Sequence, residues 1–271
     1  MNSVNIKIML ELLNDESEEI QNEIISQLSH YGLTLEEDIQ NNFGALNETQ
    51  SIKLSPILES NRREWIEQNW ISVFDSNDDF QKIEYALNLI SKFQYGLTNF
   101  SDLIEVLNKI QNDFLLKYPY ADEMDLASYL FQTMGINGDK ENNYNPFNSN
   151  ILFAIKEKKG NPITLCMLYV LLSQRCGFNV VGCNFPGHFL ARVIKEDEYF
   201  LVDCFNGGKV IYDSEIAQMA SESLESVQHI INETPNVKTI LRRILSNLQH
   251  SYSIINQFEN ASLFQRLIKT L

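Results

Sequence analysis

The sequence contains little glycine and proline, with 11 and 6 residues among 271. Long disordered linkers are enriched in these residues and are therefore not expected. No apolar run reaches the roughly 20 residues that a membrane-spanning helix needs. The N-terminal stretch also lacks the basic region and small-residue cleavage site of a secretory signal. These absences predict a cytoplasmic protein without a membrane partner.

Basic residues are scarce as well, with 21 Lys and Arg against 36 Asp and Glu and a formal charge of −15. Such a surface repels phosphate groups, so nucleic acid and anionic membranes are not expected as partners. Hydrophobic residues make up 44% of the chain and charged residues 21%, which is typical of a globular protein. The length is sufficient for one large domain or several small ones.

The four cysteines show no zinc-binding pattern. They lie at Cys166, Cys176, Cys183 and Cys204, without a CxxC spacing and without a second histidine near His188. We therefore expect no metal and no cofactor. Reduced thiols in an intracellular chain fit this usage best.

Apolar residues recur at helical spacing through the first half of the chain. Residues 6–13 and 17–31 predict a helical hairpin, and 50–74 continue as helix with Trp65 and Trp70 as packing residues. Three further apolar-periodic segments follow at 83–94, 101–118 and 124–134. The first half is therefore predicted to be helical.

A polar segment interrupts this pattern at 135–150, GINGDKENNYNPFNSN. Its Gly, Asn and Pro content predicts a surface loop that could fold over a site, with Tyr144 as a candidate binding residue. Asn161-Pro162 then begins a helix, with Asn as N-cap and Pro at the first helical position. This helix continues to Cys176 and ends at Gly177. It is apolar nearly all round, which predicts the buried central helix of its domain.

Beyond this helix, apolar residues recur at every second position, as is typical of strands. The predicted strands are NVVGCNF (179–185), HFLARVI (188–194), YFLVD (199–203) and KVIYD (209–213). We expect an antiparallel meander packed on the central helix, with Pro186-Gly187 forming a turn or a bend. From Ser214 on the chain is predicted to be helical again. The fold class is therefore α+β and mostly helical.

His188 and Asp203 form the clearest chemical constellation. Strand alternation places His188, Leu190 and Arg192 on one face. Asp203 ends the next strand, close enough for a hydrogen bond across the meander. In catalysis such a histidine serves as a base that a carboxylate orients, acting on a nucleophile at a helix N-terminus. A lone strand histidine with a purely structural role is the alternative.

The segments GNPITLCMLY, CNFPGHFLARV and VDCFNGG resemble the transglutaminase-like superfamily, and more closely its bacterial SirB branch. The resemblance covers roughly residues 80–271. It implies a central helix packed on a small antiparallel sheet and a Cys–His–Asp triad. The triad positions fall on Pro162, His188 and Asp203, so proline occupies the position of the nucleophile. Cys204 stands where the branch usually has proline.

Two helical regions flank this core. LLNDESEEIQNEIISQLSHYG resembles a HEAT-type repeat, although any short antiparallel helix pair would show the same pattern. The last helices resemble a partial tetratricopeptide hairpin. The predicted division is a HEAT-like region at 1–75, a transglutaminase-like core with its preceding helices at 76–235, and a tetratricopeptide-like hairpin at 236–271.

A relocated nucleophile is the main alternative to a lost one. Cys166 lies one helical turn beyond Pro162, about 6 Å along the axis. The helix dipole has faded there and apolar neighbours raise a thiol pKa, so we expect Cys166 to be inert. Thr164 is expected to cap backbone groups. Periodicity leaves open whether Cys183 and Cys204 face the site or the core.

Further candidate binding residues surround these positions. They are Asn161, Thr164, Asn184 and Arg192, together with the loop residue Tyr144. Arg192 could pair with Asp203, which would leave the histidine without its orienting group, or it could bind an anion.

These features support two hypotheses. The first is a non-catalytic module of the SirB type that binds a protein or peptide around Pro162, His188 and Asp203. The second is an amide- or peptide-bond hydrolase or acyl transferase with a relocated nucleophile, Cys166 or Cys204 first. The first is favoured because proline cannot attack a carbonyl.

Overall fold

The computed structural model describes residues 3–98, 101–142, 144–185, 187–195, 198–212 and 229–271. The chain divides into two compact units, Met1–Ile71 with Leu89–Phe100, and Ser72–Asn88 with Ser101–Leu271. Helix α5 (Asp79–Tyr95) contributes residues to both units. Each unit is described by itself.

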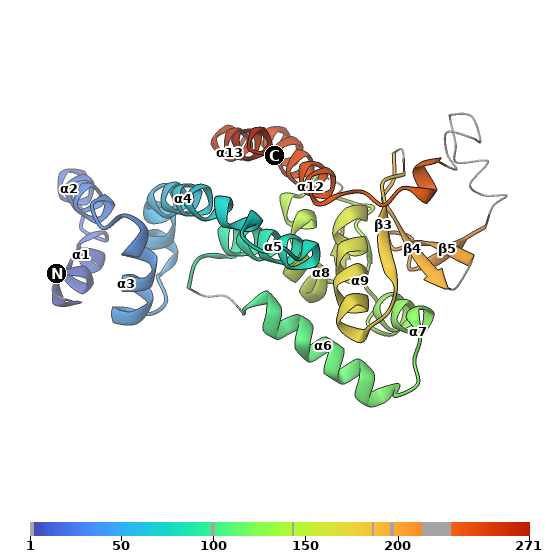
Figure 1. The fold of residues 1–271 in the computed structure, drawn as a ribbon. Coiled ribbons are helices and arrows are strands. Elements are labelled where there is room, and N and C mark those ends of the chain that lie inside the picture. The colour runs from blue at the N-terminus through green and yellow to red at the C-terminus, as the bar shows by residue number, and fades with distance from the viewer. Residues whose placement is uncertain (1–2, 99–100, 143, 186, 196–197, 213–228) are drawn as a thin grey trace. The chain divides into compact units, whose positions relative to one another are not determined.

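The first unit is helical. It contains α1 (Ser3–Leu12), α2 (Glu18–Ser29), α3 (Leu35–Asn42) and α4 (Glu48–Trp70) (Figure 1). The side chains of Ser17 and Asn47 cap α2 and α4. The core is aliphatic and consists of Ile6, Leu10, Leu13, Ile24, Leu28, Leu35, Ile39 and Leu54. The predicted hairpin and the long helix are confirmed, whereas α3 was not predicted. Trp70 is buried as expected, but Trp65 is only half-buried.

The second unit is built around one buried helix. After the first part of α5, its α-helices before the sheet are α6 (Leu103–Lys117), α7 (Glu123–Ser128), α8 (Ile151–Glu157) and α9 (Pro162–Cys176). Every residue of α9 from Ile163 to Ser173 is buried, which confirms the predicted central helix. The Asn161 side chain caps it by accepting a hydrogen bond of 3.0 Å from the Thr164 N–H. Gly177 ends it at φ +76°, a left-handed conformation that glycine adopts without strain.

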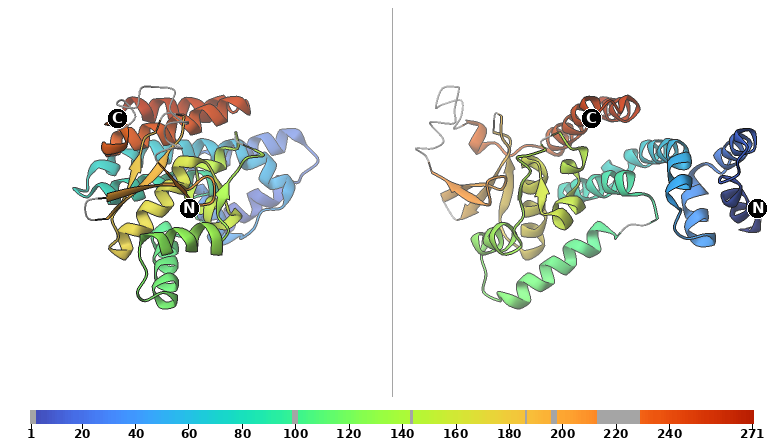
Figure 2. Two further views of the ribbon diagram at one scale, coloured as in Figure 1. Left: turned by 90° about the vertical axis from the view of Figure 1, so that its right-hand side faces the viewer. Right: turned by 180° about the vertical axis from the view of Figure 1, so that it is seen from behind.

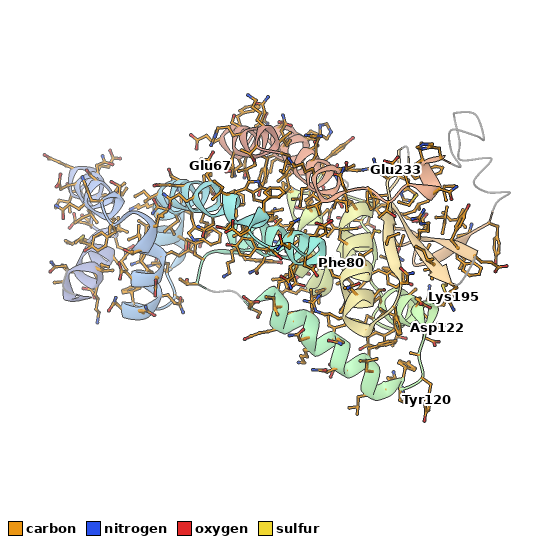
Figure 3. The ribbon with its side chains drawn as sticks, in the orientation of Figure 1. Glu67, Phe80, Tyr120, Asp122, Lys195 and Glu233 are labelled. Atoms are coloured by element: carbon orange, nitrogen blue, oxygen red, sulfur yellow. The ribbon has the colours of Figure 1, made fainter. Side chains whose placement is uncertain are left out.

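A four-stranded antiparallel meander packs on α9. Its strands are β3 (Val180–Cys183), β4 (Leu190–Lys195), β5 (Glu198–Asp203) and β6 (Lys209–Ile211), hydrogen-bonded in that order. The predicted meander is therefore confirmed. Figures 1 and 2 show α9 lying along β3 and β4, in agreement with their contacts. The end of β4 is tied to α7, because Lys195 Nζ lies 2.6 Å from Asp122 Oδ2 (Figure 3).

Two details of the sheet differ from the prediction. β4 begins at Leu190, so His188 precedes the strand and lies in a turn, where its backbone N–H donates to the Phe185 carbonyl at 3.1 Å. Gly187 has φ +71°, which takes the chain out of extended geometry just before His188. Pro186, the other half of the predicted turn, lies outside the described residues.

The segment 135–150 is exposed in its middle, at residues 140–142 and 144, as predicted for a surface loop, whereas its two ends are packed, which was not predicted. Asn137–Gly138 (β1) pairs in parallel with Lys159–Gly160 (β2), and Ile136, Asp139 and residues 148–150 are buried. Two of its asparagines, Asn145 and Asn150, serve as helix caps. Asn150, for example, caps α8 by accepting from the N–H groups of Leu152 and Phe153.

The chain ends in a helical hairpin of α12 (Val237–Ile254) and α13 (Phe258–Lys269), which lie side by side in Figures 1 and 2. This confirms the two predicted helices. The helix predicted from Ser214 falls for its first part outside the described residues. Within the described ranges, no helix is both long enough and apolar enough to span a bilayer.

Candidate functional site

His188 and Asp203 form a close pair in the second unit. Nε2 of His188 lies 2.9 Å from Oδ2 of Asp203, with the two side chains 15% and 7% exposed. Asn206 supports the same carboxylate from the next turn, since its backbone N–H donates at 3.1 Å and its side-chain amide at 2.7 Å. Among the residues that the structure describes, Nδ1 of His188 has no hydrogen-bond partner. The imidazole is thus oriented, with one ring nitrogen free for another group.

The surroundings of Asp203 favour its ionised form. Burial opposes ionisation and would raise its pKa, but the hydrogen bonds from His188 and Asn206 together outweigh burial and hold the pKa below its ordinary value. A carboxylate that remains ionised and hydrogen-bonded is what orients an imidazole in a triad. The same pairing also stabilises the fold without any catalysis.

This depressed pKa predicts that Asp203 stabilises the protein only above acidic pH. The contribution is complete above the unfolded-state pKa near 3.8 and is lost as the pH falls through the lower folded-state value. We expect Asp203→Asn to reduce the free energy of unfolding by about 2 kcal/mol near pH 7, and by much less near pH 3. Urea denaturation at both pH values checks this. Glu198→Gln, at an exposed residue of the same strand, should have little effect at either.

The N-terminus of α9 is connected to this pair through Phe205. The Gly138 N–H donates to the Phe205 carbonyl at 2.9 Å, and Gly138 lies beside Gly160, two residues before Pro162. The Phe205 ring in turn meets the His188 ring edge-on, with their centroids 6.2 Å apart. A Cβ at Gly138 would lie 2.5 Å from the Phe205 ring, so only glycine permits this approach. These contacts connect His188, through Phe205 and Gly138, to Gly160, two residues before the first position of α9.

Pro162 occupies the first position of α9. It has no side-chain nucleophile and no N–H, and Asn161 supplies the cap. The Asn161 amide also donates to Ser149 Oγ at 2.8 Å, which fixes the helix start to the preceding segment. Thr164 was expected to cap backbone groups, and this was wrong. Its hydroxyl is buried without a partner in the described part of the chain, and the cap is supplied by Asn161, which accepts from the Thr164 N–H.

Three of the four cysteines are buried, and Cys176 is half-buried. Cys166, Cys183 and Cys204 are fully enclosed, and the Cys166 thiol donates to the Leu190 carbonyl at 3.2 Å. Burial, and after it the contact with the Cys204 thiol, raises the pKa of Cys166 well above its usual range. Burial also raises the pKa values of Cys176 and Cys183 to about 11. Cys183 belongs to a hydrophobic cluster beneath the segment at 230–231, which answers the question left open by periodicity.

Arg192 does not pair with Asp203. The residue is only 7% exposed. Its guanidinium donates to the carbonyl of Ile231 and, at 2.7 Å, to Oγ1 of Thr234. Asp203 therefore remains available to His188. Tyr144 is half exposed and its ring packs edge-on against His250 of α12, 5.7 Å away.

Arg243 was missed by the sequence analysis. Its Nη1 donates to Oδ1 of Asn184 and to the Phe185 carbonyl at 3.3 Å, and its guanidinium lies over the Phe189 ring at 5.3 Å. A signal was present in the helical period of α12. Arg243 lies one turn from the buried Ile240 and next to the buried Ile244, whereas Arg242 falls on the exposed face.

The fold and the site together define an α+β protein in which a buried helix, an antiparallel meander and a His–Asp pair form one unit. A family model described as the transglutaminase-like superfamily matches residues 100–246, more than half of the chain. The chain therefore belongs to the transglutaminase-like superfamily.

The chain is similar in sequence to bacterial and mammalian proteins. Two UPF0162 proteins of Xylella fastidiosa, from strains 9a5c and Temecula1, are 33% identical over 141 residues, which is 49% of this chain and 50% of each relative. F-box only protein 21 of Mus musculus and of Homo sapiens is 25% identical over 134 residues, 46% of this chain and 21% of the relative. The chain thus spans about half the length of the bacterial relatives. No solved structure matches it.

Proposed function

We propose that this chain is a non-catalytic transglutaminase-like protein of the SirB type, which binds a protein or peptide segment around a degenerate Cys–His–Asp triad. The observation that carries the proposal is Pro162 at the first position of α9. Proline cannot form the acyl intermediate that a cysteine forms at a helix N-terminus. His188 and Asp203 nevertheless remain paired, at 2.9 Å.

The alternative is a hydrolase or acyl transferase with a relocated cysteine, and the formed His188–Asp203 pair is the observation in its favour. Its candidate nucleophiles are poorly suited to attack. Cys166 and Cys204 are completely buried, and the Cys166 thiol is directed at the Leu190 carbonyl. Stability alone is a sufficient reason for the chain to keep the His188–Asp203 pair, because removing His188 would leave a buried carboxylate with one partner fewer.

In the proposed organisation, helical regions precede and follow the core along the chain. It comprises a HEAT-like region at 1–75, the transglutaminase-like core at 76–235 and a tetratricopeptide-like hairpin at 236–271. Stacked helices of these types offer extended surfaces for protein contacts. The charge of −15 favours a protein partner over nucleic acid or an anionic membrane, in a cytoplasmic setting and without a cofactor.

Hydrolysis of 4-nitrophenyl acetate tests this proposal. We expect the wild-type protein and His188→Ala to release nitrophenol at the same slow rate, since no thiolate reaches the ester. A wild-type rate at least about a hundredfold above His188→Ala, lost again in Cys166→Ser or Cys204→Ser, would establish the relocated nucleophile instead. Circular dichroism of each variant verifies that it is folded.

A further inference from the structure

A small pocket lies beside the histidine turn, between the end of β3 and α12. Its volume is about 340 Å³. It is lined by Asn184, Ile230, Glu233, Pro235, Thr239 and Arg243. Three of these residues belong to the segment that precedes α12, and two belong to α12 itself.

Arg243 supplies a positive charge to this pocket. The side chain is half-buried, and burial lowers its pKa, opposed only by its interactions with the Cys166 and Cys183 thiols. Those thiols are neutral at physiological pH, because their own pKa values are raised. Within the described ranges no carboxylate pairs with Arg243. A guanidinium that is partly withdrawn from water without a counter-charge is unfavourable, and a bound anion would offset that cost.

The free donors at the pocket match a carboxylate. Nη1 of Arg243 is used by Asn184 and Phe185, whereas Nε and Nη2 make no hydrogen bond to any described residue. Asn184 accepts through Oδ1, so its amide N–H groups also remain for a ligand. A planar guanidinium with two adjacent free donors binds a carboxylate in bidentate fashion.

A second buried arginine strengthens the positive field. Arg192 donates to Ile231 and Thr234, on the segment that forms the pocket wall, and its Nε has no partner among the described residues. Both arginines act on the thiol of Cys183, the residue before Asn184 of the pocket lining, so both charges lie on the β3 side of the pocket. The opposing charge is Glu233, which Figure 3 shows on the segment before α12. Its side chain is 69% exposed and 3.8 Å from His229, so solvent weakens its field at the pocket without cancelling it.

The pocket shares one backbone carbonyl with the turn that carries His188. The Phe185 carbonyl accepts hydrogen bonds from Arg243 on one side and from the His188 backbone N–H on the other. A peptide segment lying against His188 would therefore reach Arg243 within a few residues. We propose that the Arg243 pocket binds a carboxylate of the peptide partner, from an acidic side chain or a free C-terminus. This inference rests on the proposed binding function and names the chemistry that the partner must present.

Three short peptides test the inference on the full chain. Acetyl-Gly-Glu-amide carries only a side-chain carboxylate, acetyl-Gly-Gly only a C-terminal carboxylate, and acetyl-Gly-Gln-amide carries neither. Titrations followed by NMR chemical shifts should show saturable binding of at least one acidic peptide and none of the neutral one. The stronger of the two acidic peptides identifies the source of the carboxylate.

Variants of α12 provide the controls. Arg243→Met should weaken binding at least about tenfold, and Arg243→Lys should weaken it less, because the charge remains while the bidentate geometry is lost. Arg242→Met, at the exposed neighbour of the same type, should leave the affinity unchanged. Glu233→Gln should tighten binding by removing the competing carboxylate.

Several results would overturn the inference. They are equal binding of the neutral peptide, absence of acidic-peptide binding, and unchanged affinity in Arg243→Met. If Arg243→Met does not fold, the other two variants decide. An acidic-peptide affinity that is the same in Arg243→Lys and in Glu233→Gln as in the wild type would also contradict the inference. None of these readouts involves turnover. Loss of the carboxylate site therefore leaves the non-catalytic proposal standing, and a His188-dependent esterase rate would refute that proposal alone.

Discussion

Pro162→Cys should create a thiol that reacts with iodoacetamide at pH 7 at least about a hundredfold faster than any native cysteine. Position 162 is the first residue of α9 and is only half-buried. The free N–H groups and the dipole of a helix N-terminus lower the pKa of a thiol placed there. The native Cys176 and Cys183, in contrast, have pKa values raised to about 11 by burial. Mass spectrometry of tryptic peptides, taken over time, measures each rate.

Matched variants separate activation from simple exposure. Pro162→Ser removes the same ring without adding a thiol, and it should show the wild-type labelling pattern. His188→Ala in the Pro162→Cys background should slow the new reaction, because the imidazole stabilises the thiolate. If Cys at position 162 reacts as slowly as the native thiols, the start of α9 is not the position of a lost nucleophile and our account of the site fails.

Phe189→Ala should be among the most destabilising single substitutions, with a loss of about 3–5 kcal/mol in the free energy of unfolding. Phe189 is completely buried. Its ring lies so close to Gly182 that a Cβ added to this glycine would be 2.9 Å from the ring. The Arg243 guanidinium lies over the ring, 5.3 Å from its centroid. Truncation leaves a cavity beneath the sheet and removes a cation–π contact. Differential scanning calorimetry should show a lower transition temperature.

Phe200→Ala is the appropriate comparison, because Phe200 lies on β5 of the same sheet but is 38% exposed. We expect its effect to be below about 1 kcal/mol. Similar losses for the two variants would contradict the packing described for the face of the sheet that meets α9.

The central helix was predictable because its signals are local. Asn161 as N-cap, Pro162 at the first position and Gly177 beyond the last turn mark its two ends. The uninterrupted apolar stretch between them indicates burial on all sides. The strands were likewise predictable from their period of two. The same local residues carried the resemblance to the superfamily that the family model confirms.

The remaining features depend on contacts between distant parts of the chain. Arg192 was assigned to Asp203 or to an anion, but its partners come from Ile231 and Thr234, about forty residues later. The packing of the first part of 135–150 depends on the pairing of Asn137–Gly138 with Lys159–Gly160. Arg243 acquires its neighbours only when α12 packs beside the end of β3. Periodicity gives the face on which a residue lies, and it does not identify what covers that face.

The most direct test of the central claim is iodoacetamide labelling of the native wild-type protein at neutral pH, with site-resolved mass spectrometry. We predict that Cys166, Cys176, Cys183 and Cys204 all remain essentially unmodified until denaturant unfolds the chain, because burial keeps each thiol enclosed or protonated. Rapid modification of one cysteine in the folded protein, abolished by His188→Ala, would contradict this prediction and reveal an active nucleophile.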